Sequence, residues 1–205
     1  MNAVDIKNAL EVISVSIKQN NSWWHIQQSV QAMRQGGVIA YPTEAVWGLG
    51  CDPFNEDAVQ HLLNIKRRPM HKGLVLIAGD LSQIEFLLDE LTDEERATVT
   101  ADWPGPFTWI LPDPKGLIPP WIKGKHQAVA VRVSAHSGVQ GLTKSYGTFI
   151  VSTSANPSEY HPARDMLKVK TYFGNDLDYV LPGELGGLAQ PTQIRDLRSN
   201  QLIRA

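Results

Sequence analysis

The spacing of apolar residues predicts helices in several parts of the chain. Ile26 and Val30 recur at helical spacing after Ser22, a residue type that favours the N-cap position, and the pair Gly36-Gly37 then ends the pattern. The same signals predict helices over residues 56–68, 81–91, 92–100, 139–146 and 163–174, and an amphipathic helical extension over residues 1–20.

Short apolar runs predict the strands. The clearest covers residues 129–133, where valines and an alanine surround a single arginine. Further runs lie at residues 38–41, 73–78, 107–111 and 148–152, with a closing hairpin at residues 194–197 and 202–204. Residues 182–190 are rich in glycine and are expected to form a loop. Because strands and helices alternate irregularly, the order indicates one α/β (α+β) domain over residues 21–205.

The composition is that of an ordinary globular protein. Of the 205 residues, 42% are hydrophobic and 20% are charged, which is enough for a sizeable core. The formal net charge is -2, so any nucleic-acid binding must come from local clusters of basic residues. Cys51 is the only cysteine, which excludes an intramolecular disulfide and suits the reducing cytoplasm. With neither a signal-peptide pattern nor a membrane-length apolar run, we expect a cytoplasmic protein with no membrane contact.

A cluster of basic residues stands at the end of the helix predicted over residues 56–68. Lys66, Arg67 and Arg68 are joined by His71 and Lys72 just before a strand. One interpretation is helix capping or a solvated face, since cations interact favourably with a helix C-terminus. The cluster is denser than capping requires. The other interpretation is a phosphate clamp, in which arginine offers a bidentate fork and lysine a point charge.

Arg132 is the single charge in the apolar run "AVAVRVSAH". A guanidinium in such a strand is rarely buried without an anionic partner. Three interpretations follow. The strand lies at the edge of the sheet, or Arg132 pairs internally with an Asp or Glu, or Arg132 binds a carboxylate or phosphate at the face of the sheet. The residues themselves leave these alternatives open.

Small polar residues crowd the end of the last apolar run of the central region. "IVSTSANPS" places Ser152, Thr153, Ser154 and Asn156 directly after a buried strand. Serine and asparagine are common caps and turn residues, so a structural role is one interpretation. The other is an oxyanion cradle, because ligands of open α/β sheets bind at the carboxyl ends of strands. Alternation along the strand would point Thr153 away from its two serine neighbours.

Other patterns exclude several kinds of site. The segment "YPTEAVWGLGCD" has glycines that permit a close backbone approach, but the chain has neither a GxGxxG fingerprint nor a P-loop. The histidines form no HExxH pair, so no metal site built by the protein is expected. Cys51 is more typical of a small core residue than of a nucleophile.

Six segments together resemble the TsaC/YrdC family: "YPTEAVWGLGCDP", "KRRPMHKGLVLIA", "WPGPFTWILP", "AVAVRVSAH", "VSTSANPS" and "PTQIRDL". They recur in order over residues 38–204, and the combination of Lys66-x-Arg68 with Ser154-x-Asn156 is specific. The resemblance is greatest to the short, single-domain bacterial members. It implies a YrdC-like twisted mixed sheet flanked by helices, with a basic concave groove.

The resemblance also implies a function. Such a protein is an L-threonylcarbamoyladenylate synthase, which makes threonylcarbamoyl-AMP and pyrophosphate from L-threonine, bicarbonate and ATP. The product serves N6-threonylcarbamoyladenosine (t6A) formation in tRNA, together with other proteins of that pathway, and Mg²⁺ is an expected cofactor. The competing function is a double-stranded RNA- or tRNA-binding protein in ribosomal RNA maturation. A structural subunit of a tRNA-modifying assembly is a third.

Individual site residues follow from the same motifs. The expected catalytic residues, which would also hold the ATP phosphates, are Lys66, Arg68, Ser154 and Asn156. Arg204 would contact the nucleotide. The residues expected around threonine are Thr43, Arg132, Ser152 and Thr192, with Arg132 taking the carboxylate. Ile77 is a departure from the pattern, because longer relatives carry a histidine there, close to threonine.

Overall fold

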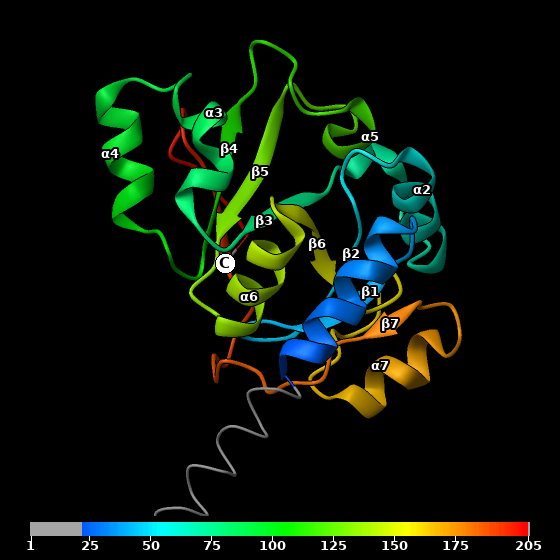
Figure 1. Cartoon of the computed structure of the whole chain (residues 1–205). Coiled ribbons are helices and arrows are strands. Elements are labelled where there is room, and N and C mark those ends of the chain that lie inside the picture. The colour runs from blue at the N-terminus through cyan, green and yellow to red at the C-terminus, as the bar shows by residue number, and fades with distance from the viewer. Residues whose placement is uncertain (1–21, 205) are drawn as a thin grey trace, which may run out of the picture.

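The computed structural model describes residues 22–204, which form a nine-stranded mixed sheet with helices packed against it (Figure 1). The extension predicted over residues 1–20 lies outside the described residues. The strand order is β7-β1-β2-β6-β3-β5-β4-β8-β9. The strands are β1 (Ile39–Pro42), β2 (Trp47–Gly50), β3 (Val75–Ala78), β4 (Phe107–Pro112), β5 (Ala128–Val133), β6 (Ile150–Ser154), β7 (Tyr179–Val180), β8 (Gln193–Asp196) and β9 (Leu202–Arg204). The pairs β1–β7, β3–β5 and β4–β8 are parallel and the other neighbours are antiparallel, which confirms a mixed sheet.

Two strands, β2 and β7, and the short helix α5 (Pro120–Lys123) are not predicted from the sequence. The strand β2 was not predicted because its sequence, "WGLG", contains two glycines, which are more typical of a turn. In the structure, Gly48 and Gly50 leave room for the ring of Tyr41 on the neighbouring strand. A Cβ added to Gly50 would lie 2.9 Å from Tyr41 Cε1 and 2.6 Å from the carbonyl oxygen of Val151. These glycines therefore permit close packing of strands.

The helices follow the predicted pattern with shifted ends. Residues 22–34 are helical, as expected. The helix predicted over 81–91 is instead two short pieces, η2 (Leu81–Ile84) and α3 (Glu85–Leu88). The helix predicted from residue 163 begins later, because Asp165 caps it through the backbone N–H of Lys168. The remaining helices are α2 (Glu56–Ile65), η1 (Met70–Lys72), α4 (Asp93–Ala101), α6 (Ser137–Tyr146) and α7 (Met166–Phe173).

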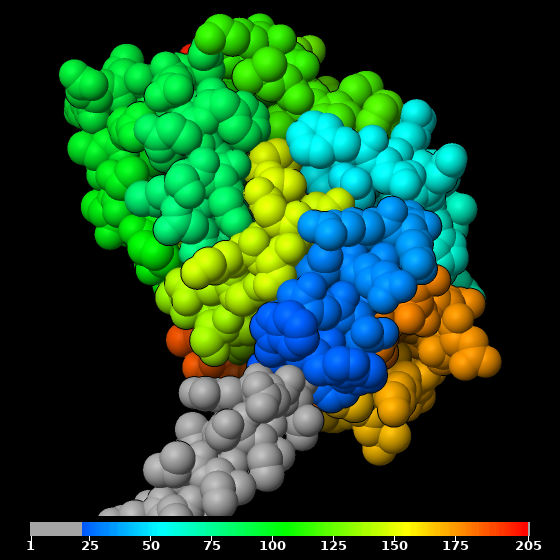
Figure 2. Space-filling model, viewed as in Figure 1, coloured from blue at the N-terminus to red at the C-terminus, as the bar shows by residue number. Residues whose placement is uncertain are grey.

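Successive residues of the central strands enter two apolar clusters on opposite faces of the sheet. Leu76 and Val151 belong to the first cluster, to which α2, α3, α5 and α7 contribute. Their neighbours Ile77 and Ile150 belong to the second. Helix 22–34 and α6 cover that second cluster and lie side by side in the space-filling view (Figure 2).

The second face also carries the polar residues of interest. Arg132 is the register partner of Ile77 on the neighbouring parallel strand, so both side chains point to the same face. Ser152 pairs with Val75 and lies two residues after Ile150, which places it there too. This face is thus apolar beneath the two helices and carries polar side chains beside them.

Candidate functional site

A pocket opens on the face of the sheet that carries Arg132 and Ser152. Most of the residues expected to bind substrates line it: Thr43, Arg68, Arg132, Ser152, Ser154, Thr192 and Arg204. Thr108 on β4 adds a hydroxyl that was not expected. Thr153 is also part of the lining, although its register partner Leu49 lies in the first apolar cluster, on the opposite face. Residues far apart in sequence therefore converge on one place.

Three arginines meet at this pocket. Arg68 donates to the carbonyl oxygen of Gly73 at 2.8 Å, and Arg204 donates to the carbonyl oxygen of Thr192 at 2.9 Å. Burial lowers the pKa of Arg204, and the positive charges of Arg132 and Arg68 lower it further. Within residues 22–204, only Arg132 of the three has an acidic partner. The pocket is therefore rich in positive charge and suited to anions.

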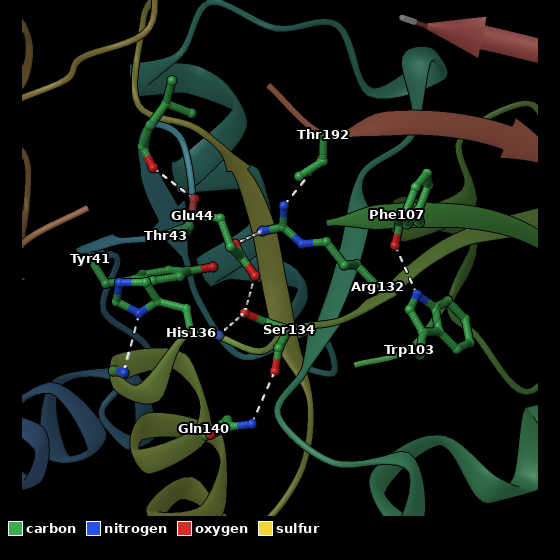
Figure 3. Close-up of polar contacts among 12 residues, drawn as sticks. Tyr41, Thr43, Glu44, Trp103, Phe107, Arg132, Ser134, His136, Gln140 and Thr192 are labelled. Carbon is green, nitrogen blue, oxygen red and sulfur yellow. Dashed lines mark hydrogen bonds and ion pairs between the residues drawn. The ribbon is translucent and has the colours of Figure 1, made fainter. Parts of the chain in front are cut away.

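Arg132 lies on β5, a central strand, so the edge-strand interpretation is wrong. Its Nη1 donates to Thr192 Oγ1 at 3.1 Å, and its Nη2 lies 3.5 Å from Glu44 Oε2 (Figure 3). Glu44 Oε1 in turn accepts a hydrogen bond of 2.5 Å from Ser134 Oγ. Arg132 thus has the internal acidic partner that sequence analysis allowed, and it also lines the pocket.

The end of α2 explains the spacing of Lys66-x-Arg68. The backbone N–H of Arg67 donates to Asn64 and that of Arg68 to Leu63, the hydrogen-bond pattern of a Schellman motif. Arg67 occupies the left-handed position of this motif, with φ of 51°. The chain therefore reverses at Arg67, which stays exposed while Lys66 is buried.

The buried Nζ of Lys66 is hydrogen-bonded to the end of β6. It donates to the carbonyl oxygens of Ser154 and Asn156, the latter at 2.7 Å. Ser158 completes the attachment, because its backbone N–H donates to the carbonyl oxygen of Lys66 at 2.8 Å. Burial, and then the charge of Arg68, lowers the pKa of Lys66 to about 7. Lys66 lies beside the pocket and is not part of its lining.

Asn156 also lies beside the pocket. Its Nδ2 donates to the carbonyl oxygens of Pro157 at 2.9 Å and Tyr160 at 2.8 Å. Its Oδ1 is buried and has no hydrogen-bond partner. Ser154 is on the pocket wall, opposite Gly48 in register. The S-x-N motif therefore contributes one residue to the wall and one to the turn behind it.

The glycine-rich loop over residues 182–190 runs along Thr43 and Glu44. Gly186 N–H donates to the carbonyl oxygen of Thr43 at 3.0 Å, and Leu188 N–H donates to that of Glu44 at 3.0 Å. His136 Nε2 lies 3.0 Å from the carbonyl oxygen of Glu184. A Cβ added to Gly186 would lie 3.0 Å from the Cα of Glu44, so glycine permits this close approach.

A second, larger hollow adjoins the pocket and shares Arg68, Leu74, Val75 and Ile194 with it. Its floor is apolar, with Ile110, Ile122 and Ala130, and its rim carries Lys72, Lys123, Lys125 and His126. Lys123 is paired with Asp113 at 2.5 Å. The lining of the hollow also includes the acid Asp196, and the hollow with the pocket beside it is the place where a basic groove would lie.

Ile77, at the position where longer relatives carry a histidine, does not reach the pocket. Ile77 is fully buried in the second apolar cluster and is not part of the pocket lining. Across residues 22–204, no three His, Cys, Asp or Glu side chains gather closely enough to hold a metal ion. Among the helices in that range, none is long and apolar enough to cross a membrane.

Sequence reasoning missed Glu44 and Ser134, which lie behind Arg132. Glu44 follows an apolar strand, as Ser134 does, and each is a polar residue next to a buried run. A search for the acidic partner that a buried arginine requires would have considered Glu44. The contact between Glu44 and Ser134 depends on the sheet, because Glu44 lies just after β1 and Ser134 just after β5.

The sequence pattern of the Sua5_yciO_yrdC family, described as "Telomere recombination", matches residues 31–205. A Hahella chejuensis protein named "Threonylcarbamoyl-AMP synthase" is 50% identical over 183 residues, which are 89% of this chain and 99% of that protein. A Stutzerimonas stutzeri protein of the same name is 51% identical over 181 residues, 88% of this chain and 97% of that protein.

Two solved structures have the same fold. The crystal structure of P. abyssi Sua5 complexed with L-threonine aligns with a TM-score of 0.79 and 29% identity. The alignment covers 85% of this chain and 51% of the Sua5 chain, so this chain corresponds to about half of that protein. The crystal structure of E. coli YciO aligns with a TM-score of 0.78 and 26% identity over 89% of each chain.

Proposed function

The chain belongs to the Sua5, YciO and YrdC family, and from this we infer that it is a threonylcarbamoyl-AMP synthase, a transferase that uses ATP and L-threonine in tRNA processing. Bicarbonate is the third substrate of the proposed reaction. The similarity extends over nearly the full length of the Hahella chejuensis and Stutzerimonas stutzeri relatives. We therefore propose for this chain the whole activity for which those relatives are named.

The observation that carries the proposal is the meeting of Arg68, Arg132 and Arg204 at one pocket with a single acidic partner, Glu44, among the described residues. The reaction brings together a triphosphate and two carboxylates. Positive charges with uncharged hydroxyl donors around them suit such a set of anions. The pocket offers both kinds of group.

We assign ATP to the boundary between the pocket and the adjoining hollow. Arg68 lines both and Arg204 lines the pocket, so the phosphates would lie between these two guanidinium groups. Ser154 would donate its hydroxyl to a phosphate oxygen. Lys66 and Asn156 would support this place, either from behind the turn or by turning toward bound phosphate. The apolar floor of the hollow would accept the nucleoside.

We assign threonine to the part of the pocket around Arg132. The guanidinium would bind the threonine carboxylate, as arginine commonly does through its planar fork. Thr43, Ser152 and Thr192 line the pocket and carry hydroxyls suited to the remaining polar groups of threonine. Arg132 and Thr192 are already hydrogen-bonded, which fixes the two relative to one another.

The chemistry needs positioning more than a protein nucleophile. The threonine amine forms a C–N bond with bicarbonate carbon and water leaves, which gives N-carboxy-threonine. An oxygen of the new N-carboxylate, not of the threonine carboxylate held by Arg132, then attacks the α-phosphorus of ATP, and the bond to pyrophosphate breaks. Arg68 and Arg204 would neutralise the charge that gathers on the phosphates, and Arg132 would hold the amino acid in line.

The residues present do not fit a Mg²⁺ site made by the protein. Within residues 22–204 there is no suitable cluster of acids, and the buried carboxylate of Glu44 is engaged by Ser134 and Arg132. Mg²⁺ needs oxygen ligands and is often held largely by substrate phosphates. Any Mg²⁺ in the reaction would arrive on ATP.

RNA binding is a second candidate, favoured by the exposed basic residues Lys72, Lys125 and His126 on the rim of the adjoining hollow. A tRNA or double-stranded RNA could contact this rim. In the enzyme proposal, other proteins of the t6A pathway would use the product in the cytoplasm. Phosphate contacts of this kind make RNA affinity fall steeply as salt rises. Adenylate formation without RNA separates the enzyme from a purely RNA-binding protein.

The decisive experiment measures pyrophosphate release from ATP with bicarbonate, testing each amino acid in turn without RNA. Release that requires both L-threonine and bicarbonate supports the proposed function. Serine lacks one methyl group, so discrimination of only about 10- to 200-fold is expected from binding alone. Absence of release with threonine, from folded protein, would contradict the proposal.

A further inference from the structure

We propose that Glu44 is a positioning residue for threonine binding, whose carboxylate holds the Arg132 guanidinium in the pocket wall from behind. The proposal rests on the proposed function, because it takes Arg132 as the receptor of the threonine carboxylate. Glu44 itself is not part of the pocket lining. Its influence on the substrate would therefore pass through Arg132.

The burial of both residues makes this pairing necessary. Glu44 and Arg132 are each 7% exposed. A buried charge is costly unless it is paired and hydrogen-bonded. Among residues 22–204, Glu44 is the acid within ion-pair distance of Arg132, with 3.5 Å between Nη2 and Oε2. Glu44 thus supplies the counter-charge that allows an arginine to stand in this central strand.

The pairing leaves part of the guanidinium unused. Arg132 Nη1 donates to Thr192, whereas Arg132 Nε is buried without a hydrogen-bond partner. Glu44 Oε2 also has no hydrogen-bond partner, because its contact with Nη2 is long. Two contacts therefore restrain the guanidinium, one on Nη1 and one on Nη2, and they engage two of its five N–H donors. A carboxylate ligand in the pocket would accept from the remaining donors of the planar fork.

Glu44 is itself held at both ends. Ser134 Oγ donates to Oε1 at 2.5 Å, and the same Oγ accepts the backbone N–H of His136 at 3.1 Å (Figure 3). The backbone of Glu44 accepts the N–H of Leu188 at 3.0 Å. A carboxylate fixed in this way can orient its partner, because neither end is free to move.

The test is to titrate L-threonine and, separately, ATP into the full chain by calorimetry, with steady-state KM values for both substrates. Glu44→Gln keeps the shape and removes the charge. We expect it to weaken L-threonine binding about tenfold, the scale of one charge-assisted hydrogen bond, with ATP affinity retained. Ser134→Ala removes the hydrogen bond that holds the carboxylate of Glu44. It should also weaken L-threonine binding, but by less than Glu44→Gln does. Glu94→Gln, the same change on exposed α4, is the matched control.

The outcomes separate this proposal from the proposed function. If wild-type protein binds no L-threonine, the proposed function fails and this proposal fails with it. If wild-type protein binds it and Glu44→Gln binds it equally well, or loses threonine and ATP affinity equally, the positioning role alone is overturned. If Glu44→Gln does not fold, Ser134→Ala decides: selectively weaker threonine binding supports the role, and unchanged binding overturns it.

Discussion

The Nζ of Lys66, at the end of α2, donates a hydrogen bond of 2.7 Å to the carbonyl oxygen of Asn156, just beyond β6. It also donates to the carbonyl oxygen of Ser154. The two halves of the expected phosphate site, K-x-R and S-x-N, are therefore joined directly to each other. Nucleotide binding and the conformation of this turn should be coupled through Lys66.

The first prediction concerns protons taken up with ATP. The pKa of Lys66 is lowered to about 7, so at about pH 8 the free protein holds this amine mostly neutral. Bound phosphate favours the charged form and raises the pKa. ATP binding should therefore take up a proton above the free pKa, and the uptake should diminish as pH falls below it. Calorimetry in buffers of different ionisation enthalpy measures this uptake.

Lys66→Met provides the comparison for that measurement. ATP has titratable groups of its own, so the informative quantity is the difference in proton uptake between wild type and variant at each pH. Equal uptake by the two proteins at about pH 8 would show that Lys66 does not respond to the nucleotide.

The second prediction concerns Arg68. Arg68→Ala removes a guanidinium that lines both the pocket and the adjoining hollow. We expect adenylate formation to fall by about 10²-fold or more, the scale of losing one preorganised donor to a developing charge. Arg67→Ala, the same change at the exposed neighbouring residue, should retain activity. Similar rates for Arg68→Ala and wild type would remove Arg68 from the phosphate site.

The third prediction concerns Arg132. Arg132→Ala should raise the KM for threonine about 10- to 100-fold, because a charge-assisted contact to the carboxylate is lost. The KM for ATP should change less. A thermal melt accompanies the kinetics, since removing Arg132 leaves Glu44 buried without its ionic partner. A larger effect on ATP than on threonine would count against the assignment.

The fourth prediction concerns stability alone. Arg67 has φ of 51°, a left-handed conformation that costs a non-glycine residue about 1–2 kcal/mol. Arg67→Gly should raise the free energy of unfolding by about 1 kcal/mol, with activity retained, because glycine adopts this conformation without the Cβ clash. Denaturant unfolding measures the change. A lower stability would mean that the Arg67 side chain contributes more than the backbone strain removes.

The sequence alone determined most local structure. Helical spacing and caps located helix 22–34, α2 and α4, because these signals are local in the chain. Apolar runs located β3, β4, β5 and β6 for the same reason. The strand β2 was not predicted, because its glycines are needed only to make room for the ring of Tyr41, which the neighbouring strand brings against them.

The candidate site divides in a similar way. Residue type and spacing singled out Arg68, Arg132 and Ser154 but left their roles open, and the resemblance to the family selected them as site residues; all three line the pocket. They did not indicate that Lys66 is buried against the turn that contains Asn156. They also did not identify Glu44 as the partner of Arg132.

The physical reason is the distance along the chain over which each interaction acts. Helix caps, turns and the alternation of strand residues join neighbours, so the sequence by itself determined them. The contacts of Lys66 with Asn156 and of Glu44 with Arg132 join residues far apart in the chain. Only the order of strands in the sheet brings these residues together, and burial is what makes each charged side chain require a partner.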